Sequence, residues 1–177
     1  MLKRLAVFLG IALFFVTAQR TEPQKNLGNI QSEDEVKIAI LQGEVEGYPL
    51  FASINVSLKG YRQKKDLPWF VSVSTNFLHP SKNGLPDDNE FSGLNDWEDL
   101  VEARIGKVCR YAYLGHVTYK GSREVLFYVD SSEAAESALR KLKEEQKTLK
   151  FDFGVNRDDD WKSVDVYFKE NPNLPLK

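Results

Sequence analysis

The residues of this 177-residue chain that could carry chemistry are one cysteine, a histidine inside an apolar run and nearby carboxylates. Cys109 and His116 could act as a nucleophile and its base, with Glu98 or Asp99 orienting the imidazole. No nucleophile motif surrounds Cys109, which follows Val108 at the end of a predicted buried helix stripe. We therefore expect Cys109 to be a small buried hydrophobe and His116 to point outward from a strand. We assign no catalytic residue and retain His116, Glu98 and Asp99 as the candidates for a hydrolase.

Three carboxylates, Glu98, Asp99 and Glu102, fall within one turn of a predicted helix. Paired carboxylates can carry acid–base catalysis. An exposed helix face has the same composition, and here Arg104 and Lys107 supply countercharge. We favour the solvated face.

An acidic run near the C-terminus, Asp158 to Asp160, could bind calcium through its oxygen atoms. The run lacks the alternating spacing and the distal glutamate of a calcium-binding loop. A helix N-terminus favours aspartate because of capping and the helix dipole. We therefore interpret Asp160 as the cap of a short last helix, and we predict no metal site and no cofactor.

The candidate binding surface is the outer face of two predicted strands, 50–58 and 67–78, in which apolar side chains alternate with polar or aromatic ones. We expect these strands to be neighbours in an antiparallel sheet, so that their outer side chains form one nearly uncharged surface. Its members are Phe51, Ser53, Asn55, Phe70, Ser72, Ser74 and Asn76. Such a surface suits a protein or glycan partner. Alternatively, a helix or the N-terminal leader covers this face, and the two phenylalanines form a second small core.

A predicted turn, Asn83-Gly84-Leu85-Pro86, could add a binding loop, since binding residues often lie on loops. Its plainer interpretation is a tight turn in which Gly84 takes a positive φ. It holds no glycine-rich run and no Lys-Ser/Thr pair, so it does not predict a phosphate site.

The N-terminus is typical of a secretory signal peptide, with basic residues 3–4 followed by an apolar run at 5–16. We predict cleavage before Gln19; an uncleaved anchor is the alternative, but the run is short for a bilayer. A single cysteine cannot form an internal disulfide, which fits a bacterial periplasm better than an animal extracellular domain. We therefore expect a periplasmic or secreted protein without a stable membrane anchor after cleavage.

The chain is expected to fold as one domain. Residues 1–18 would be the signal peptide, 19–35 a mobile polar leader, 36–172 the domain and 173–177 a tail. Losing Lys3 and Arg4 changes the formal charge from −2 to −4, and a mixed, mildly acidic surface argues against nucleic-acid binding.

The periodicity predicts the element order βββ-α-ββ-α-β-α. The first helix, about 90–110, would bury the stripe Leu94, Trp97, Val101, Ile105 and Val108. A hairpin follows within 111–129, and then a helix, a strand at 148–155 and the short last helix. This order indicates an α+β fold with a mainly antiparallel sheet of about six strands and helices packed on one face.

Several short motifs share an order and spacing with one known family. They are Gly84-Leu85-Pro86, Trp97-Glu98-Asp99, Gly115 to Arg123, Phe127-Tyr128-Val129 and Asp160-Trp161. The chain resembles, over roughly residues 44–172, the bacterial family catalogued as domain of unknown function 695. That resemblance implies a single α+β domain and no particular activity. The family usually has an aliphatic residue where Trp97 stands.

Our leading hypothesis is an exported, non-catalytic bacterial module that binds a protein or glycan through the sheet face or the loop around Asn83. One alternative is a small hydrolase, which requires a cleft in which His116 reaches a glutamate or aspartate. A second alternative is an inhibitor or immunity-like protein whose acidic helix faces meet a basic partner.

Overall fold

The computed structural model describes residues 27–32, 35–148 and 150–168. Its strands are β1 (Gly28–Asn29), β2 (Ile38–Val45), β3 (Tyr48–Asn55), β4 (Trp69–Asn76), β5 (Arg110–Tyr119), β6 (Ser122–Val129) and β7 (Phe151–Arg157). Its helices are α1 (Asp88–Gly106), α2 (Ser132–Glu145) and α3 (Asp165–Phe168), with 3-10 turns η2 (Val56–Gly60), η3 (Lys64–Asp66) and η4 (Lys162–Val164).

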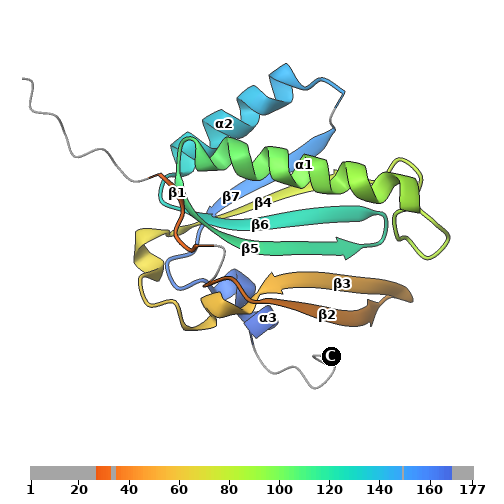
Figure 1. Ribbon diagram of the computed structural model, residues 1–177, viewed down its shortest axis with the longest axis horizontal. Coiled ribbons are helices and arrows are strands. Elements are labelled where there is room, and N and C mark those ends of the chain that lie inside the picture. The colour runs from red at the N-terminus through yellow and green to blue at the C-terminus, as the bar shows by residue number, and fades with distance from the viewer. Residues whose placement is uncertain (1–26, 33–34, 149, 169–177) are drawn as a thin grey trace, which may run out of the picture.

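The strands form one sheet in the order β2-β3-β5-β6-β4-β7, and every pair along this path is antiparallel. The short β1 pairs with β5 in parallel. Figure 1 shows α1 and α2 lying across one side of β4, β5 and β6, with β2 and β3 curling away below. The predicted α+β class with a mainly antiparallel sheet is therefore confirmed.

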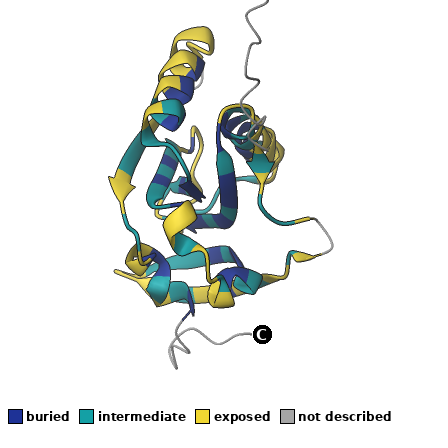
Figure 2. Cartoon of the chain, turned by 90° about the vertical axis from the view of Figure 1, so that its left-hand side faces the viewer, coloured by how far each residue is buried: buried dark blue, intermediate teal, exposed yellow. Residues whose placement is uncertain are grey.

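Each face of the sheet carries its own hydrophobic core. The first core lies under the two long helices and includes Val71, Val125 and Phe127 from the strands, with Val101 and Leu139 from the helices. The second core lies on the opposite face, within the curl of the sheet; Ile54, Leu114, Leu126, Trp161 and Phe168 belong to it. Figure 2 shows buried residues concentrated in the strands and on the helix sides that face them. The helices therefore pack on one face as predicted, except that the short α3 closes the other.

The two long helices begin at side-chain caps. The Asp87 carboxylate accepts from the backbone N–H of Glu90 at 2.8 Å, and Ser131 Oγ accepts from that of Ala134 at 3.3 Å. The predicted α1 stripe is buried except for Val108, which is 38% exposed. That assignment was wrong because α1 ends at Gly106, so that the chain has already left the helical period.

Two further expectations about the strands were wrong. The strand predicted at 50–58 ends at Asn55, and the chain turns into η2. More importantly, β3 and β4 are not neighbours, because the β5–β6 hairpin lies between them. Consecutive strands are adjacent only about two thirds of the time, and here the η2–η3 connection carries the chain past the hairpin.

The predicted leader is partly inside the fold. Gly28 and Ile30 donate backbone hydrogen bonds to the carbonyls of Cys109 and Tyr111, at 3.0 and 2.8 Å, and Ile30 packs against the second core. The predicted signal peptide and the tail at 173–177 lie outside the described residues.

The junction of β3 and β5 depends on a glycine. Gly115 has φ +132° and lies at a register shift in β5, opposite Ile54. A Cβ at this position would lie 1.9 Å from the Ser53 carbonyl oxygen. No other residue type fits there without moving β3.

We therefore predict that Gly115→Ala lowers the free energy of unfolding by about 3 kcal/mol or more, because it combines backbone strain with a backbone clash. Gly60→Ala is the matched control, since a Cβ at Gly60 meets nothing within 4 Å and that glycine has no positive φ. Urea denaturation of both variants measures the effect, and equal stability of the two would contradict the prediction.

Candidate binding surface around His116

The centre of the site is a buried carboxylate between α1 and the sheet. Glu98 is 7% exposed. Nδ1 of His116 lies 2.9 Å from Glu98 Oε2 and 3.0 Å from Oε1. The Tyr113 hydroxyl donates to Oε1, and Arg123 Nη1 lies 3.5 Å from Oε2. Glu98 thus ties α1 to both β5 and β6.

Arg123 is the countercharge to Glu98 and is itself only 1% exposed. Its Nη1 donates to Asn95 Oδ1 at 2.8 Å, and its Nε lies 3.4 Å from Thr118 Oγ1. The guanidinium also lies 5.3 Å from the centre of the Phe91 ring. A buried charge is tolerated when its hydrogen-bonding groups find partners of this kind.

The surroundings shift the ionisation of this cluster. Burial tends to raise the pKa of Glu98, but its hydrogen bonds from His116 and Tyr113, together with the charges of His116 and Arg123, lower it below the ordinary value. Burial and the neighbouring Glu98 carboxylate raise the pKa of the Tyr113 phenol. Glu98 therefore stays ionised at neutral pH and holds the imidazole in one orientation.

His116 brings this buried network to the surface, since its side chain is 23% exposed. Cross-strand pairing places Ser53 opposite His116, and Ile40 opposite Ser53. Because directly paired residues share a face of the sheet, Ile40, Ser53 and His116 form one row. Gln42, Phe51 and Thr118 form the next row along the strands. We call these two rows the β2–β3–β5 face.

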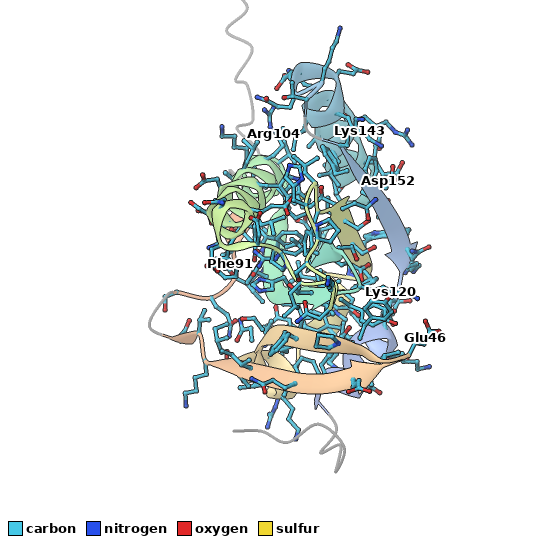
Figure 3. The ribbon with its side chains drawn as sticks, turned by 90° about the vertical axis from the view of Figure 1, so that its right-hand side faces the viewer. Glu46, Phe91, Arg104, Lys120, Lys143 and Asp152 are labelled. Atoms are coloured by element: carbon cyan, nitrogen blue, oxygen red, sulfur yellow. The ribbon has the colours of Figure 1, made fainter. Side chains whose placement is uncertain are left out.

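Figure 3 shows how this face is bounded. Phe91, 52% exposed, lies at the edge of α1 on the side of the β2–β3 hairpin. At the other end, the Lys120 ammonium lies 2.8 Å from Glu46 Oε2, joining the tips of the β5–β6 and β2–β3 hairpins. All members of the face are exposed or half-buried except Thr118, which is 6% exposed, so the face is open along β2 and β3 beside the helix.

The predicted binding surface is divided by the fold. Phe51 and Ser53 lie on the β2–β3–β5 face, as described above. Asn55 is 1% exposed, and its Nδ2 donates to Gln31 Oε1 at 2.8 Å and to the Tyr113 carbonyl at 3.2 Å. Asn55 is thus a buried structural residue, and its assignment to an exposed face was wrong.

The β4 members of that surface lie elsewhere. Val71 and Val73 face the first core, so the alternating residues Phe70, Ser72 and Ser74 face the opposite side of the sheet. The Phe70 ring lies 5.4 Å from that of Tyr128 in the second core. Asn76 is exposed at the end of β4. The expected single surface does not exist, because β5 and β6 separate its two halves.

The loop around Asn83 is held by its own hydrogen bonds. Asn83 Oδ1 accepts from the Ser81 hydroxyl at 2.5 Å and from the Leu85 N–H at 3.2 Å. Gly84 has φ +78°, and a Cβ there would lie 3.0 Å from Lys120 Cα. The plainer interpretation, a tight turn packed on a hairpin, accounts for both residues.

Cys109 and His116 do not form a catalytic pair. Cys109 is fully buried, with its sulfur 3.7 Å from the Ser131 carbonyl. It precedes β5, whereas His116 lies seven positions further along that strand, about 20 Å away at the usual rise per residue. The interpretation of Cys109 as a small buried hydrophobe is confirmed.

The expectation of a solvated carboxylate face holds for Asp99 and fails for Glu98. Asp99 is exposed. Glu102 is half-buried and accepts from the Tyr111 hydroxyl at 2.7 Å. Burial raises the pKa of Glu102, with further contributions from Glu98 and Asp99, although the Tyr111 hydrogen bond opposes the shift.

Capping at the acidic run is confirmed, but the capping residue is Asp158 and not Asp160. Asp158 accepts from the backbone N–H groups of Lys162 and Ser163, each at 2.8 Å, and from the Tyr128 hydroxyl at 2.7 Å. Trp161 turns the chain with φ 61°, so Asp158 reaches over it. Within the described ranges, no group of three or more His, Cys, Asp or Glu residues is arranged to hold a metal ion.

We predict that Glu98→Gln lowers the free energy of unfolding by about 3 kcal/mol at pH 7, because Arg123 loses its buried countercharge. The pKa of Glu98 is lowered in the folded state, so its stabilisation is fully present above the ordinary value of 4.5 and is lost as the pH falls through the folded value. The difference between wild type and variant should therefore shrink in acid.

Glu136→Gln is the control for this experiment. Glu136 pairs with Arg140 at 3.3 Å on an exposed helix surface, where such a pair contributes about 0.5 kcal/mol or less. Denaturant titrations between pH 7 and pH 3 provide the comparison. A Glu98 variant as stable as the Glu136 variant at neutral pH would refute the role given to Glu98.

The helices in the described part of the chain include none long and apolar enough to cross a membrane. Comparison with known proteins found no curated protein and no solved structure that matches the chain. A family model, described as a family of unknown function (DUF695), matches residues 38–169. That match spans the described fold from β2 to the end of α3, and the chain belongs to this family.

Proposed function

We propose that this protein is an exported, non-catalytic binding module that captures an extended segment of a partner protein along the outer edge of β2. The observation that carries the proposal is an unprotected apolar edge strand. Ile38, Ile40 and Val45 are 48, 55 and 44% exposed, and β2 pairs on one side only within the described residues.

Edge strands of natural proteins usually carry features that prevent pairing with another chain. Charged side chains, proline and bulges serve this purpose. The β2 sequence, Ile38–Val45, contains no proline, its one charged residue is Glu44 near the hairpin turn, and its pairing with β3 runs without a register shift. Its unpaired backbone groups therefore offer a template for an added strand.

The opposite edge of the sheet shows the contrast. β7 presents Asp152, whose carboxylate lies 2.8 Å from the Lys143 ammonium. The Arg140 guanidinium lies 5.6 Å from the centre of the Phe153 ring, and the Lys143 ammonium lies 5.6 Å from the centre of the Phe151 ring. Charged side chains and cation–π contacts thus disfavour the pairing of β7 with another strand. The edge open to a partner is therefore β2.

The β2–β3–β5 face supplies specificity beside that edge. An added strand would place alternate side chains next to Ile40 and Gln42, with Ser53 and Phe51 one strand further into the sheet. Backbone pairing provides affinity in this mode of recognition, and neighbouring side chains select the sequence.

The export part of the proposal rests on residues 1–18, with their basic start and apolar run. Cleavage before Gln19 would release the module into the periplasm or the medium, where its partner would be found. A single buried cysteine suits an oxidising compartment.

The test is site-specific photo-crosslinking in the native host, with a photoreactive amino acid in place of Ile40. We expect a discrete adduct whose crosslink maps to an extended segment of another protein, and its loss when Ile38→Lys is added. Ile38 is half exposed, so that substitution should leave the stability of the fold unchanged within about 0.5 kcal/mol.

The same amino acid at Val108 is the control, since Val108 is an exposed apolar residue next to the start of β5. Equal adducts at both positions would contradict the proposal. An adduct containing only two copies of this chain would replace it with a homodimer.

A hydrolase is the second candidate, favoured by the position of Ser53. Ser53 is paired with His116, so their Cβ atoms lie about 5 Å apart, and Glu98 orients the imidazole from its far side. This candidate predicts cleavage of p-nitrophenyl acetate that Ser53→Ala and His116→Ala each reduce at least about a hundredfold, while Ser72→Ala has no effect. Turnover that ignores Ser53 would end it.

A further inference from the structure

We propose that a two-part hollow at the β4–β7 end of the sheet binds a small amphipathic anion, with an apolar body and one acidic group. This site is separate from the edge of β2 and does not depend on the function proposed there. Its two parts meet at Asn76 and Lys150, which line both.

The apolar part lies between α1 and the end of β4 and has a volume of about 360 Å³. Leu78, Gly93, Leu94 and Trp97 line it. Leu78 is 79% exposed. An apolar body seated here would remove this surface from water.

A buried donor without an acceptor lies at the same place. Trp97 is 5% exposed, and its indole Nε1 has no hydrogen-bond partner in the part of the chain that the structure describes. A buried N–H without an acceptor is costly and calls for an explanation. Trp97 lines the hollow, but its Nε1 is closed to water, so an oxygen atom of a bound molecule would supply the missing acceptor once the lining shifts around it.

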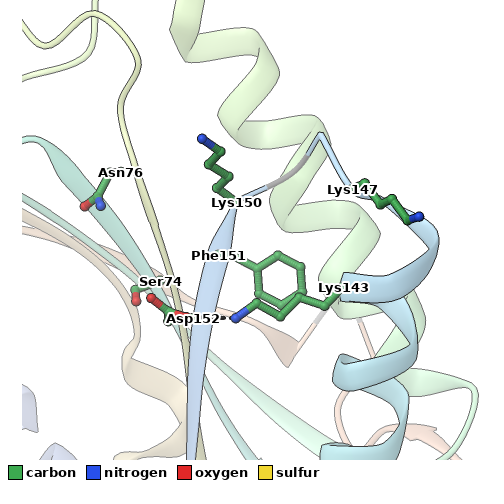
Figure 4. A pocket seen from close by; sticks show the side chains of 7 residues that line it. All are labelled: Ser74, Asn76, Lys143, Lys147, Lys150, Phe151 and Asp152. Carbon is green, nitrogen blue, oxygen red and sulfur yellow. Dashed lines mark hydrogen bonds and ion pairs between the residues drawn. The ribbon is translucent and has the colours of Figure 1, made fainter.

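The cationic part, about 430 Å³, lies between the end of α2 and the start of β7. Figure 4 shows Lys143 reaching Asp152, while the side chains of Lys147 and Lys150 extend away from that pair. None of the salt bridges among the described residues involves Lys147 or Lys150. These two ammonium groups are available to an anion on a protein that is acidic overall.

The acidic groups of the hollow are already engaged. Glu90 lines the apolar part, but its carboxylate accepts from the backbone N–H groups of Leu78 and His79. Asp152 is paired with Lys143. The lining holds three lysines against these two carboxylates, a net formal charge of +1, which favours an amphipathic anion over a neutral or cationic molecule of the same shape.

The test uses dodecanoate below its micelle concentration as the probe, titrated into the purified protein. We expect binding at one site and a downfield shift of the Trp97 indole N–H in proton–nitrogen NMR spectra, assigned with Trp97→Phe. The indole signals of Trp69 and Trp161 should stay in place, because neither lines the hollow. Dodecanol, which lacks the charge, should bind at least about tenfold more weakly.

Two variants and a control decide the result. Lys147→Gln combined with Lys150→Gln should weaken dodecanoate binding about tenfold, whereas Lys59→Gln with Lys65→Gln should not change it. Gly93→Leu should abolish binding without unfolding the protein, because a Cβ at Gly93 meets nothing within 4 Å. The absence of binding, equal affinity for dodecanol, or full binding by either of the two variants would overturn the proposal.

Discussion

The structure depends on the neutralisation of one buried carboxylate. Removing Glu98 from water costs several kcal/mol, and that cost is offset only because His116, Tyr113 and Arg123 all converge on it. These partners come from β5 and β6, whereas Glu98 comes from α1. The helix can therefore cross the sheet at only one position, since any slide along the strands would leave a charge buried without its partner.

The position of α1 over β5 and β6 determines which part of the sheet the helix leaves uncovered. β3 continues the sheet beyond the helix, and it can approach β5 closely only because Gly115 has no side chain. The result is a sheet that curls around a second core while its outer side near β2 stays open. The same helix also lines the hollow at the β4–β7 end of the sheet. Trp97 and Glu98 are consecutive, and consecutive helical residues point about 100° apart, so Trp97 can line that hollow while Glu98 contacts His116.

The sequence predicts most elements of this fold, and the errors have physical causes. Apolar periods located α1 and α2, and a turn between two β-rich runs located the β5–β6 hairpin, because these signals are local. The order of strands in the sheet is not local, so β3 and β4 were wrongly placed side by side. Part of the Glu98 site was predicted: His116 and Glu98 were candidates, but nothing in the sequence places Arg123 beneath a helix that ends seventeen residues earlier.

The two surfaces proposed for binding lie at opposite edges of the sheet. β2 and β7 are separated by five strand-to-strand steps of about 4.8 Å each, so a segment paired with β2 and a ligand in the β4–β7 hollow would not touch. Among the described elements, only α1 takes part in both: Trp97 lines the hollow, and Glu98 contacts His116 of the β2–β3–β5 face. Because the Glu98 network holds that helix rigidly to the strands, occupancy at one edge should leave the other unchanged, and the two binding events should be thermodynamically independent.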